Sequence, residues 1–242
     1  MENILWIGGI VGLAAAVQSL AGFGFALVAI ALLPFFLDLQ VAVPLVLVMS
    51  LASSLSLWLY YWDSFNWKAI APLALSALVS IPIGLAGLHY VPEEIARKLL
   101  GSFIVLYVGY DILRLMVPMF SPPALDSPYW AYVFGGMSGL LTGALTTGGP
   151  PLVMYANSKE WSPAEFKGNL PGVYVVAIAF ALAGHYFEGH LTFELWQIAL
   201  WSAPLFIVGT TVGIMLSNRI DTDSFKRIIL SLLGMIGLKL IW

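Results

Sequence analysis

The sequence predicts an all-α polytopic membrane protein with about eight apolar helical segments. Hydrophobic residues make up 60% of its 242 residues and charged residues only 10%, whereas about a quarter of a soluble domain is charged. The Lys, Arg, Asp and Glu residues fall mostly between long apolar runs. In addition, a glycine-rich interruption occurs in one apolar run of each half. These observations predict two homologous halves, each opening with a broken or re-entrant helix.

The first apolar run, residues 3–37, is too long for one straight spanning helix. At 1.5 Å per residue it would measure roughly 50 Å, against a hydrocarbon core of about 30 Å. Small and polar residues interrupt the run between Ser19 and Phe25. We therefore expect a long first helix, a break, and a shorter second helix that ends near Pro34.

Three more runs of spanning length, residues 41–62, 67–88 and 95–117, complete the first half. Aromatic residues at their ends suit the interfacial belts of a membrane protein. A proline-rich stretch, residues 118–128, follows these runs, and its composition predicts an irregular linker.

The second half has the same order of features. It opens with a run that is broken at 146–151, and it continues with three further runs; these four runs cover residues 129–156, 170–187, 193–216 and 225–242. Matched positions include Gly24 with Gly149, and Trp67 with Trp196. We therefore interpret the chain as a single membrane domain, residues 1–242, with internal repeats 1–117 and 129–242 joined by linker 118–128.

Two relative orientations of the repeats remain open. If each broken segment crosses the membrane, each half has four spans and the halves run parallel. If each is a re-entrant hairpin, each half has an odd number of spans and the halves are inverted. The positive-inside rule does not discriminate, because either arrangement gathers seven of the ten Lys and Arg residues on one side. Both place the loops 157–169 and 217–227 in the cytoplasm.

The two breaks are the candidate binding site. A break in a membrane helix exposes N–H and C=O groups that lipid cannot satisfy, so such backbone is tolerated only inside protein or along a wet cavity. Breaks at corresponding positions of two halves indicate a transporter's binding site. The predicted substrate-binding residues are Gln18, Ser19, Gly22, Gly24, Thr146, Thr147, Gly148, Gly149, Pro150, Asn157, Lys167 and Asn169.

The second break has the features of an anion site. Proline is favoured at the first position of a helix, so Pro150 and Pro151 suggest a helix that restarts inside the bilayer. The N-terminus of such a helix attracts anions, and Thr146 and Thr147 add hydroxyl donors. Four upstream glycines have the spacing of a helix-packing surface, and we assign them to packing: Gly135, Gly136, Gly139 and Gly143.

Several polar residues allow two interpretations. Gln18 could donate to an oxyanion or could tie down the backbone of its own break. Lys167 could be a countercharge for an anion or a solvated loop lysine. Asp111 and Arg114 are three residues apart and are expected to pair with each other. The spacing of His185, Glu188 and His190 does not predict a metal site.

The stretch from Gly135 to Tyr155, with its Thr-Thr-Gly-Gly-Pro-Pro turn, resembles the second signature of the sulfite exporter TauE/SafE family. The region from Gln18 to Val28 is similar to the weaker first signature, with Gly22-Phe-Gly-Phe where many members carry a run of glycines. The resemblance implies a multi-pass inner-membrane protein that moves sulfite, sulfonates or related small organic anions.

Other functions are excluded or left open. The net charge of −3 without a basic cluster argues against a nucleic-acid partner. The chain has no cysteine, no His-Glu-x-x-His motif and no paired intramembrane carboxylates, so we predict neither an enzyme nor a bound cofactor or metal. We expect a secondary transporter of a small anion in the lipid bilayer, working as an exporter. An anion-selective channel and a carrier for small carboxylates are the alternatives. A coupled proton and the oligomeric state stay open.

Overall fold

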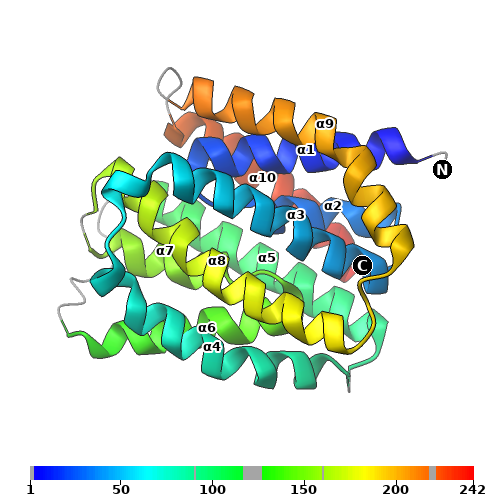
Figure 1. Ribbon diagram of the computed structural model, residues 1–242, viewed down its shortest axis with the longest axis horizontal. Coiled ribbons are helices and arrows are strands. Elements are labelled where there is room, and N and C mark those ends of the chain that lie inside the picture. Colours follow the sequence, from blue (N-terminus) through cyan, green and yellow to red (C-terminus); the bar gives the residue numbers. More distant parts are fainter. Residues whose placement is uncertain (1–2, 90, 117–126, 160, 218–221) are drawn as a thin grey trace.

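The computed structural model describes residues 3–89, 91–116, 127–159, 161–217 and 222–242, and these residues are almost entirely helical. The helices lie side by side, and both chain ends lie toward the same side of the molecule (Figure 1). The described elements are α1 (Ile4–Ala21), α2 (Phe25–Leu32), η1 (Leu33–Phe35), α3 (Leu39–Tyr60), η2 (Trp62–Ser64), α4 (Trp67–His89), α5 (Glu93–Met116), α6 (Tyr129–Leu145), α7 (Gly149–Asn157), α8 (Pro163–Phe187), α9 (Phe193–Leu216) and α10 (Thr222–Ile241).

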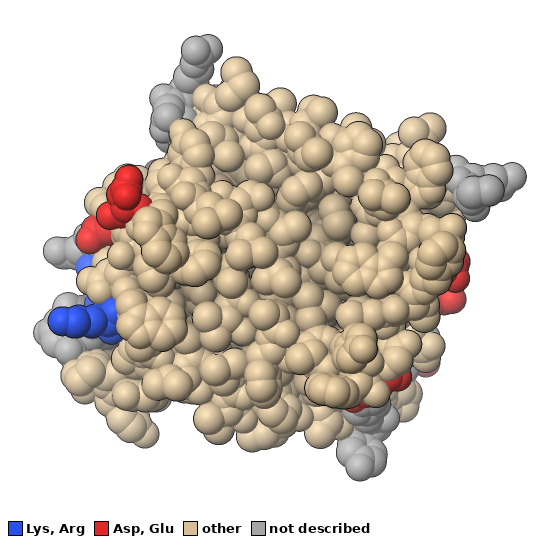
Figure 2. All heavy atoms as spheres, in the orientation of Figure 1, with Lys and Arg blue, Asp and Glu red and all other residues tan. Residues whose placement is uncertain are grey.

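Five of the described helices, α1, α3, α4, α8 and α9, are long and apolar enough to cross a membrane. Shorter apolar helices cover residues 25–35 and 98–110. Large apolar side chains such as Trp201 and Ile207 are well exposed, and Figure 2 shows a broad middle zone without charged residues. The predicted all-helical membrane class is therefore confirmed, whereas the predicted number of eight segments is not established by these five spans.

Both predicted breaks are present, at the predicted places. α1 ends at Ala21, and the backbone of Gly22 and Gly24 has φ values of 84° and 108°, which glycine adopts without the clash that a Cβ would cause. α6 ends at Leu145, and Thr146 follows with a φ of 57°. A β-branched residue is rarely found in this left-handed region, so the second break holds a strained residue.

Each broken segment doubles back on itself. Trp6, near the start of α1, stacks on Phe36, which follows η1, with ring centroids 6.4 Å apart. In the second half, Phe134 in α6 lies 6.0 Å from Tyr155 in α7, between ring centroids. The helices α1–α2 and α6–α7 therefore form two hairpins, each with a long and a short arm (Figure 1).

The two hairpins enter the helical layer from opposite ends. α3 and α8 are antiparallel, because the Lys167 Nζ in the first turns of α8 lies 5.8 Å from the ring centroid of Tyr61, which directly follows α3. The first hairpin opens beside the start of α3, since Phe36 precedes that helix; the second opens beside the start of α8. The opposite directions of the two hairpins are the arrangement that the re-entrant alternative of the sequence analysis expects, and that alternative remains a prediction.

Small residues bring the hairpins against their neighbours. A Cβ added to Gly139 in α6 would overlap the Ala77 carbonyl oxygen of α4, and one added to Gly209 in α9 would overlap the Gly12 carbonyl of α1. Gly135 and Gly143 approach α4 equally closely, whereas a Cβ on Gly136 would meet nothing within 4 Å. The close packing expected of the four glycines is therefore seen for three of them, whereas Gly136 contacts α4 through its carbonyl, which accepts a hydrogen bond from the Ser80 Oγ at 2.8 Å.

Some predictions fall on parts of the chain that the structure does not describe. Most of the predicted linker 118–128 lies outside the described residues, and so do Arg219 and the side chains of Asp111 and Arg114. The expected pair between Asp111 and Arg114 therefore remains a prediction.

Candidate functional site

The second break is deeply buried and rich in hydroxyl groups. Thr147 is 0% exposed, and its N–H donates to the Leu141 carbonyl at 3.2 Å; the N–H of Thr146 donates to the Thr142 carbonyl at 3.1 Å. These two bonds close the end of α6. Neither hydroxyl oxygen of Thr146 and Thr147 has a hydrogen-bond partner among the described residues.

Two hydroxyl groups from outside the predicted set join them. Ser138 in α6 is close enough to Gly148 that a Cβ there would lie 2.8 Å from its Oγ. A Cβ on Gly149 would lie 3.5 Å from the Tyr174 hydroxyl of α8. Like the two threonines, Ser138 and Tyr174 are buried and have no hydrogen-bond partner for their hydroxyls among the described residues.

Sequence reasoning missed Ser138 and Tyr174 for different reasons. Ser138 lies eight and nine residues before the two threonines on the same segment, and its spacing of four from Thr142 places both on one face of α6. That spacing was a usable signal. Tyr174 comes from α8, and no local pattern connects it to the break.

The restarted helix offers fewer backbone donors than expected. α7 begins at Gly149, so Pro150 and Pro151 occupy its second and third positions and supply no N–H. The expected restart of a helix at these prolines is present, with both prolines in its first turn. With two of its first three positions lacking an N–H, this helix end depends on the surrounding hydroxyls for hydrogen-bond donors.

At the first break, Gln18 bridges the gap in the helix. Its Oε1 accepts a hydrogen bond from the Phe25 N–H at 3.3 Å, and its Nε2 donates to the Ser54 Oγ of α3 at 3.0 Å. These two hydrogen bonds support the interpretation in which Gln18 holds the backbone of its own break. The Ser19 hydroxyl is buried without a hydrogen-bond partner among the described residues.

The polar residues that follow the second break have separate surroundings. Lys167 is only 9% exposed, and its side chain lies against Gly22 of the first break. Asn169 is 1% exposed, and its Oδ1 accepts a hydrogen bond from the Asn66 N–H at 2.8 Å, which fixes α8 to the connection before α4. Asn157 ends α7 and is half-buried.

Helix α8 connects the two breaks. Lys167 lies beside Gly22, and Tyr174 lies beside Gly149. These two α8 residues are seven positions apart, so they lie on one face of the helix, roughly 10 Å apart along its axis. The predicted residues therefore form two groups along α8 rather than one cluster.

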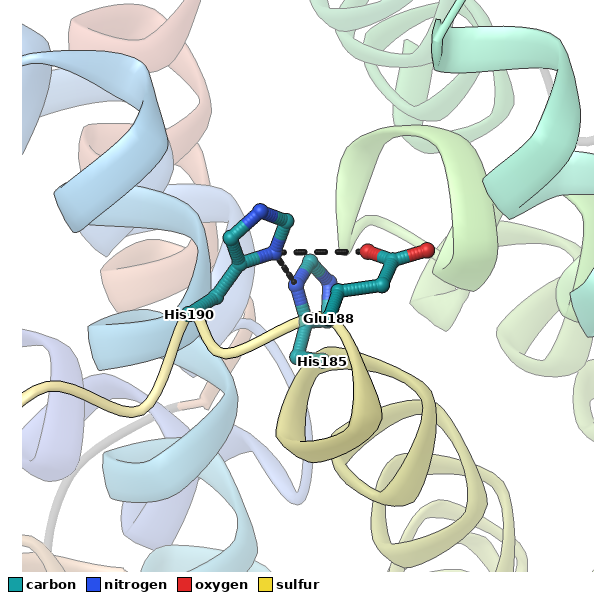
Figure 3. Close-up of side chains that lie close together, drawn as sticks. All are labelled: His185, Glu188 and His190. Atoms are coloured by element: carbon teal, nitrogen blue, oxygen red, sulfur yellow. Dashed lines mark hydrogen bonds and ion pairs between the residues drawn. The ribbon is translucent and has the colours of Figure 1, made fainter.

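A cavity of about 350 Å³ lies next to the second break, within the size range of small-ligand pockets. None of the twelve predicted residues, all of which the structure describes, lines it. Its polar wall is formed by Gln40 of α3 and by three residues at the end of α8, His185, Glu188 and His190 (Figure 3). The other lining residues are Ile30, Leu39, Val43, Pro44, Leu85, Val91, Leu100, Ala144 and Leu145.

On the face of the molecule that Figure 2 shows, basic and acidic residues are unevenly placed. In Figure 2, the blue side chains of Lys and Arg gather at one end of the visible face, whereas red acidic side chains occur at both ends. In the shared orientation of Figures 1 and 2, this basic end is the end at which α8 begins.

Comparisons with known proteins agree on one family. A family model described as "Sulfite exporter TauE/SafE" matches residues 7–240. The chain is 29% identical over 180 residues to a Comamonas testosteroni protein named "Probable inner membrane transporter protein TsaS", with 72% of each chain covered. It is 24% identical over 177 residues to a Cupriavidus necator protein named "Probable sulfite/organosulfonate exporter TauE", with 72% of this chain and 68% of that one covered. No solved structure matches the chain.

Proposed function

This chain belongs to the sulfite exporter TauE/SafE family of membrane transporters, and we propose that it carries a small organosulfur anion such as sulfite or a sulfonate across the inner membrane. The observation that carries the proposal is the group of buried hydroxyls around the start of α7, together with Lys167 two helical turns away on the same face of α8 as Tyr174. The names of the Comamonas and Cupriavidus relatives support the membrane and the substrate class.

The chemistry of the site suits an oxyanion. A sulfite or sulfonate group presents three oxygen atoms, all of them hydrogen-bond acceptors. Thr146, Thr147, Ser138 and Tyr174 can each donate one O–H, and hydrogen bonds to charged groups contribute about 1.5–3 kcal/mol each. Lys167 supplies a cation at the first break, two helical turns away. An anion that moves along α8 from the second break to the first would meet the hydroxyl donors before Lys167. An anion that moves in the other direction would meet Lys167 first.

The two halves of the chain are proposed to be inverted repeats. The pairs of closely packed helices are consistent with this: exchanging α1 with α6 and α4 with α9 converts the α1–α9 pair into the α4–α6 pair. The same exchange of halves swaps α3 with α8 and α5 with α10, so the packed pairs α3–α8 and α5–α10 each convert into themselves. Pro44 in α3 and Pro171 in α8 supply a further matched feature. Each repeat would then consist of one hairpin and three spanning helices.

The orientation and the direction of transport follow from charge. In the re-entrant alternative of the sequence analysis, seven of the ten Lys and Arg residues are assigned to the side on which α8 begins, so the positive-inside rule would place that side in the cytoplasm. Lys167 would then face an anion arriving from the cytoplasm. Export of an anion from an inside-negative cell is downhill by about 2.3 kcal/mol per charge per 100 mV, so we propose export without a coupled ion.

Ligand-dependent thermal stability of the purified full-length protein tests the substrate class. A ligand that binds only the folded protein raises the apparent Tm by mass action. We expect sulfite or a simple alkanesulfonate to raise the Tm, and acetate or sodium chloride at equal ionic strength to leave it unchanged. Sulfate, which carries two charges, is added in the same assay to compare its effect on the Tm with that of sulfite. A Tm that responds to none of these anions, together with no uptake of radiolabelled sulfite into proteoliposomes under an imposed voltage, would refute the proposal.

A further inference from the structure

Three side chains that can bind metals converge at the end of α8 (Figure 3). The Nδ1 atoms of His185 and His190 are 2.9 Å apart, and the His190 Nδ1 lies 3.3 Å from the Glu188 Oε2. One ligand atom from each residue lies within 4.8 Å of the others. His185 is 6% exposed, whereas His190 and Glu188 are about one-third exposed, so the group has a buried side and a side that a solute can reach.

The local backbone explains why the three side chains meet. α8 ends at Phe187, and Gly189 adopts a φ of 77°, a conformation that favours glycine. The chain turns back there, and the His190 N–H donates to the His185 carbonyl at 3.0 Å. This turn places His190 over the last turn of the helix, against His185.

The spacing fits a small divalent metal ion. Bonds from zinc to imidazole nitrogen or carboxylate oxygen measure about 2.0–2.2 Å, and tetrahedral angles then place neighbouring ligand atoms about 3.3–3.5 Å apart. Two of the three observed separations, 2.9 Å and 3.3 Å, come within about half an ångström of those values, and the ligand atoms of His185 and Glu188 lie within 4.8 Å of each other. Two imidazoles and one carboxylate are also a donor set that zinc accepts with its fourth position open.

We propose that His185, Glu188 and His190 bind one divalent transition-metal ion of the Zn²⁺ type. The ion would lie on the wall of the cavity that Ala144 and Leu145 also line, immediately before the second break. It would place a positive charge there, and it would tie the connection between α8 and α9 to the end of α8. The proposal rests on the geometry of these three side chains and does not depend on which solute is transported.

Metal binding to the purified full-length protein tests the proposal. The protein is prepared with an affinity tag that contains no histidine, stripped with a chelator, and titrated with Zn²⁺ by calorimetry. We expect one Zn²⁺ per chain and a Tm raised by about 5 °C or more at a Zn²⁺ concentration 100 times the Kd. Substitution with Co²⁺ should give the visible absorption of a cobalt ion with nitrogen and oxygen ligands.

The variants separate this site from surface binding. His185→Ala and His190→Gln should each weaken Zn²⁺ binding at least about tenfold. Loss of a residue that only supports a metal ligand already lowers affinity by about 10- to 100-fold. Glu194→Gln removes a nearby exposed carboxylate of α9 and should leave the affinity unchanged. His190→Gln changes a residue that is about one-third exposed, so it remains informative if His185→Ala fails to fold. Absence of Zn²⁺ binding, or binding that survives in both histidine variants, would overturn the proposal and leave only a hydrogen bond between the two imidazoles.

Discussion

Replacing Thr147 with valine should have opposite effects on stability and on anion binding. Thr147 is 0% exposed, and its hydroxyl has no hydrogen-bond partner among the described residues. Thr147→Val exchanges that hydroxyl for a methyl group and keeps the branched shape of the side chain. If the hydroxyl is there to bind an anion, the anion-free protein should tolerate its loss, whereas the anion-bound protein should not.

The size of each effect follows from the burial of the hydroxyl. A buried polar group without a partner costs about 1–3 kcal/mol of stability, and in a chain of this length 1 kcal/mol corresponds to about 2–4 °C in Tm. The variant without anion should therefore have an equal Tm or one higher by a few degrees. A hydrogen bond to a charged ligand contributes about 1.5–3 kcal/mol, so the Kd for the anion should rise by about 10- to 150-fold.

The assay measures both quantities on the same preparation. The Tm is recorded without ligand and over a range of sulfite or alkanesulfonate concentrations, from which the Kd is obtained. Thr211→Val is the matched control, because Thr211 is exposed on α9 and its hydroxyl donates to the Ile207 carbonyl of its own helix; its Kd should be unchanged. A lower Tm without ligand for Thr147→Val, or an unchanged Kd, would show that the hydroxyl supports the fold and does not bind the anion.

Three further changes test the structure more widely. Gly139→Ala should lower the stability by about 1–3 kcal/mol because its methyl group would overlap α4, whereas Gly136→Ala on the same helix should raise it by up to about 1 kcal/mol; equal Tm values would contradict the α4–α6 contact. Lys167→Gln should raise the Kd for the anion at least about tenfold, and Lys98→Gln, an exposed residue paired with Glu94, should not; the same Tm titration compares them. Ser162→Ala removes the side-chain oxygen that caps α8 and should lower the Tm by about 2–4 °C; a Tm equal to that of the unchanged protein would mean that the cap contributes nothing.

The helix breaks could be predicted from the sequence because their cause is local. The run 3–37 exceeds the membrane thickness, and glycine is the residue that tolerates the left-handed backbone seen at Gly22 and Gly24. The direction of the chain after each break could not be predicted, because it depends on contacts between distant residues. Trp6 meets Phe36, and nothing in the composition of either segment identifies the other as its partner.

The site could be predicted only in the parts that lie within one segment. Thr146 and Thr147 could be proposed as site residues because they stand at the break itself, whereas Tyr174 approaches the break from the middle of another helix. Asn169 was assigned to the substrate on its position near the break, yet its side chain bonds the backbone of Asn66. Its assignment to the substrate remains a prediction without a contact to support it. His185 and His190 are brought together by a turn, and sequence spacing alone gives no measure of how closely a turn folds back.

Pro171 interrupts the backbone hydrogen bonding of α8 between the two residues that lie beside the breaks. Pro171 lies inside α8, between Lys167 and Tyr174. In a continuous helix the N–H of residue 171 would donate to the carbonyl of residue 167. Proline has no N–H, so the part of α8 between Lys167 and Tyr174 lacks one backbone hydrogen bond. Helices bend most readily at such positions. A bend of α8 at Pro171 would change the distance between Lys167 and Tyr174, the two α8 residues that lie beside the breaks.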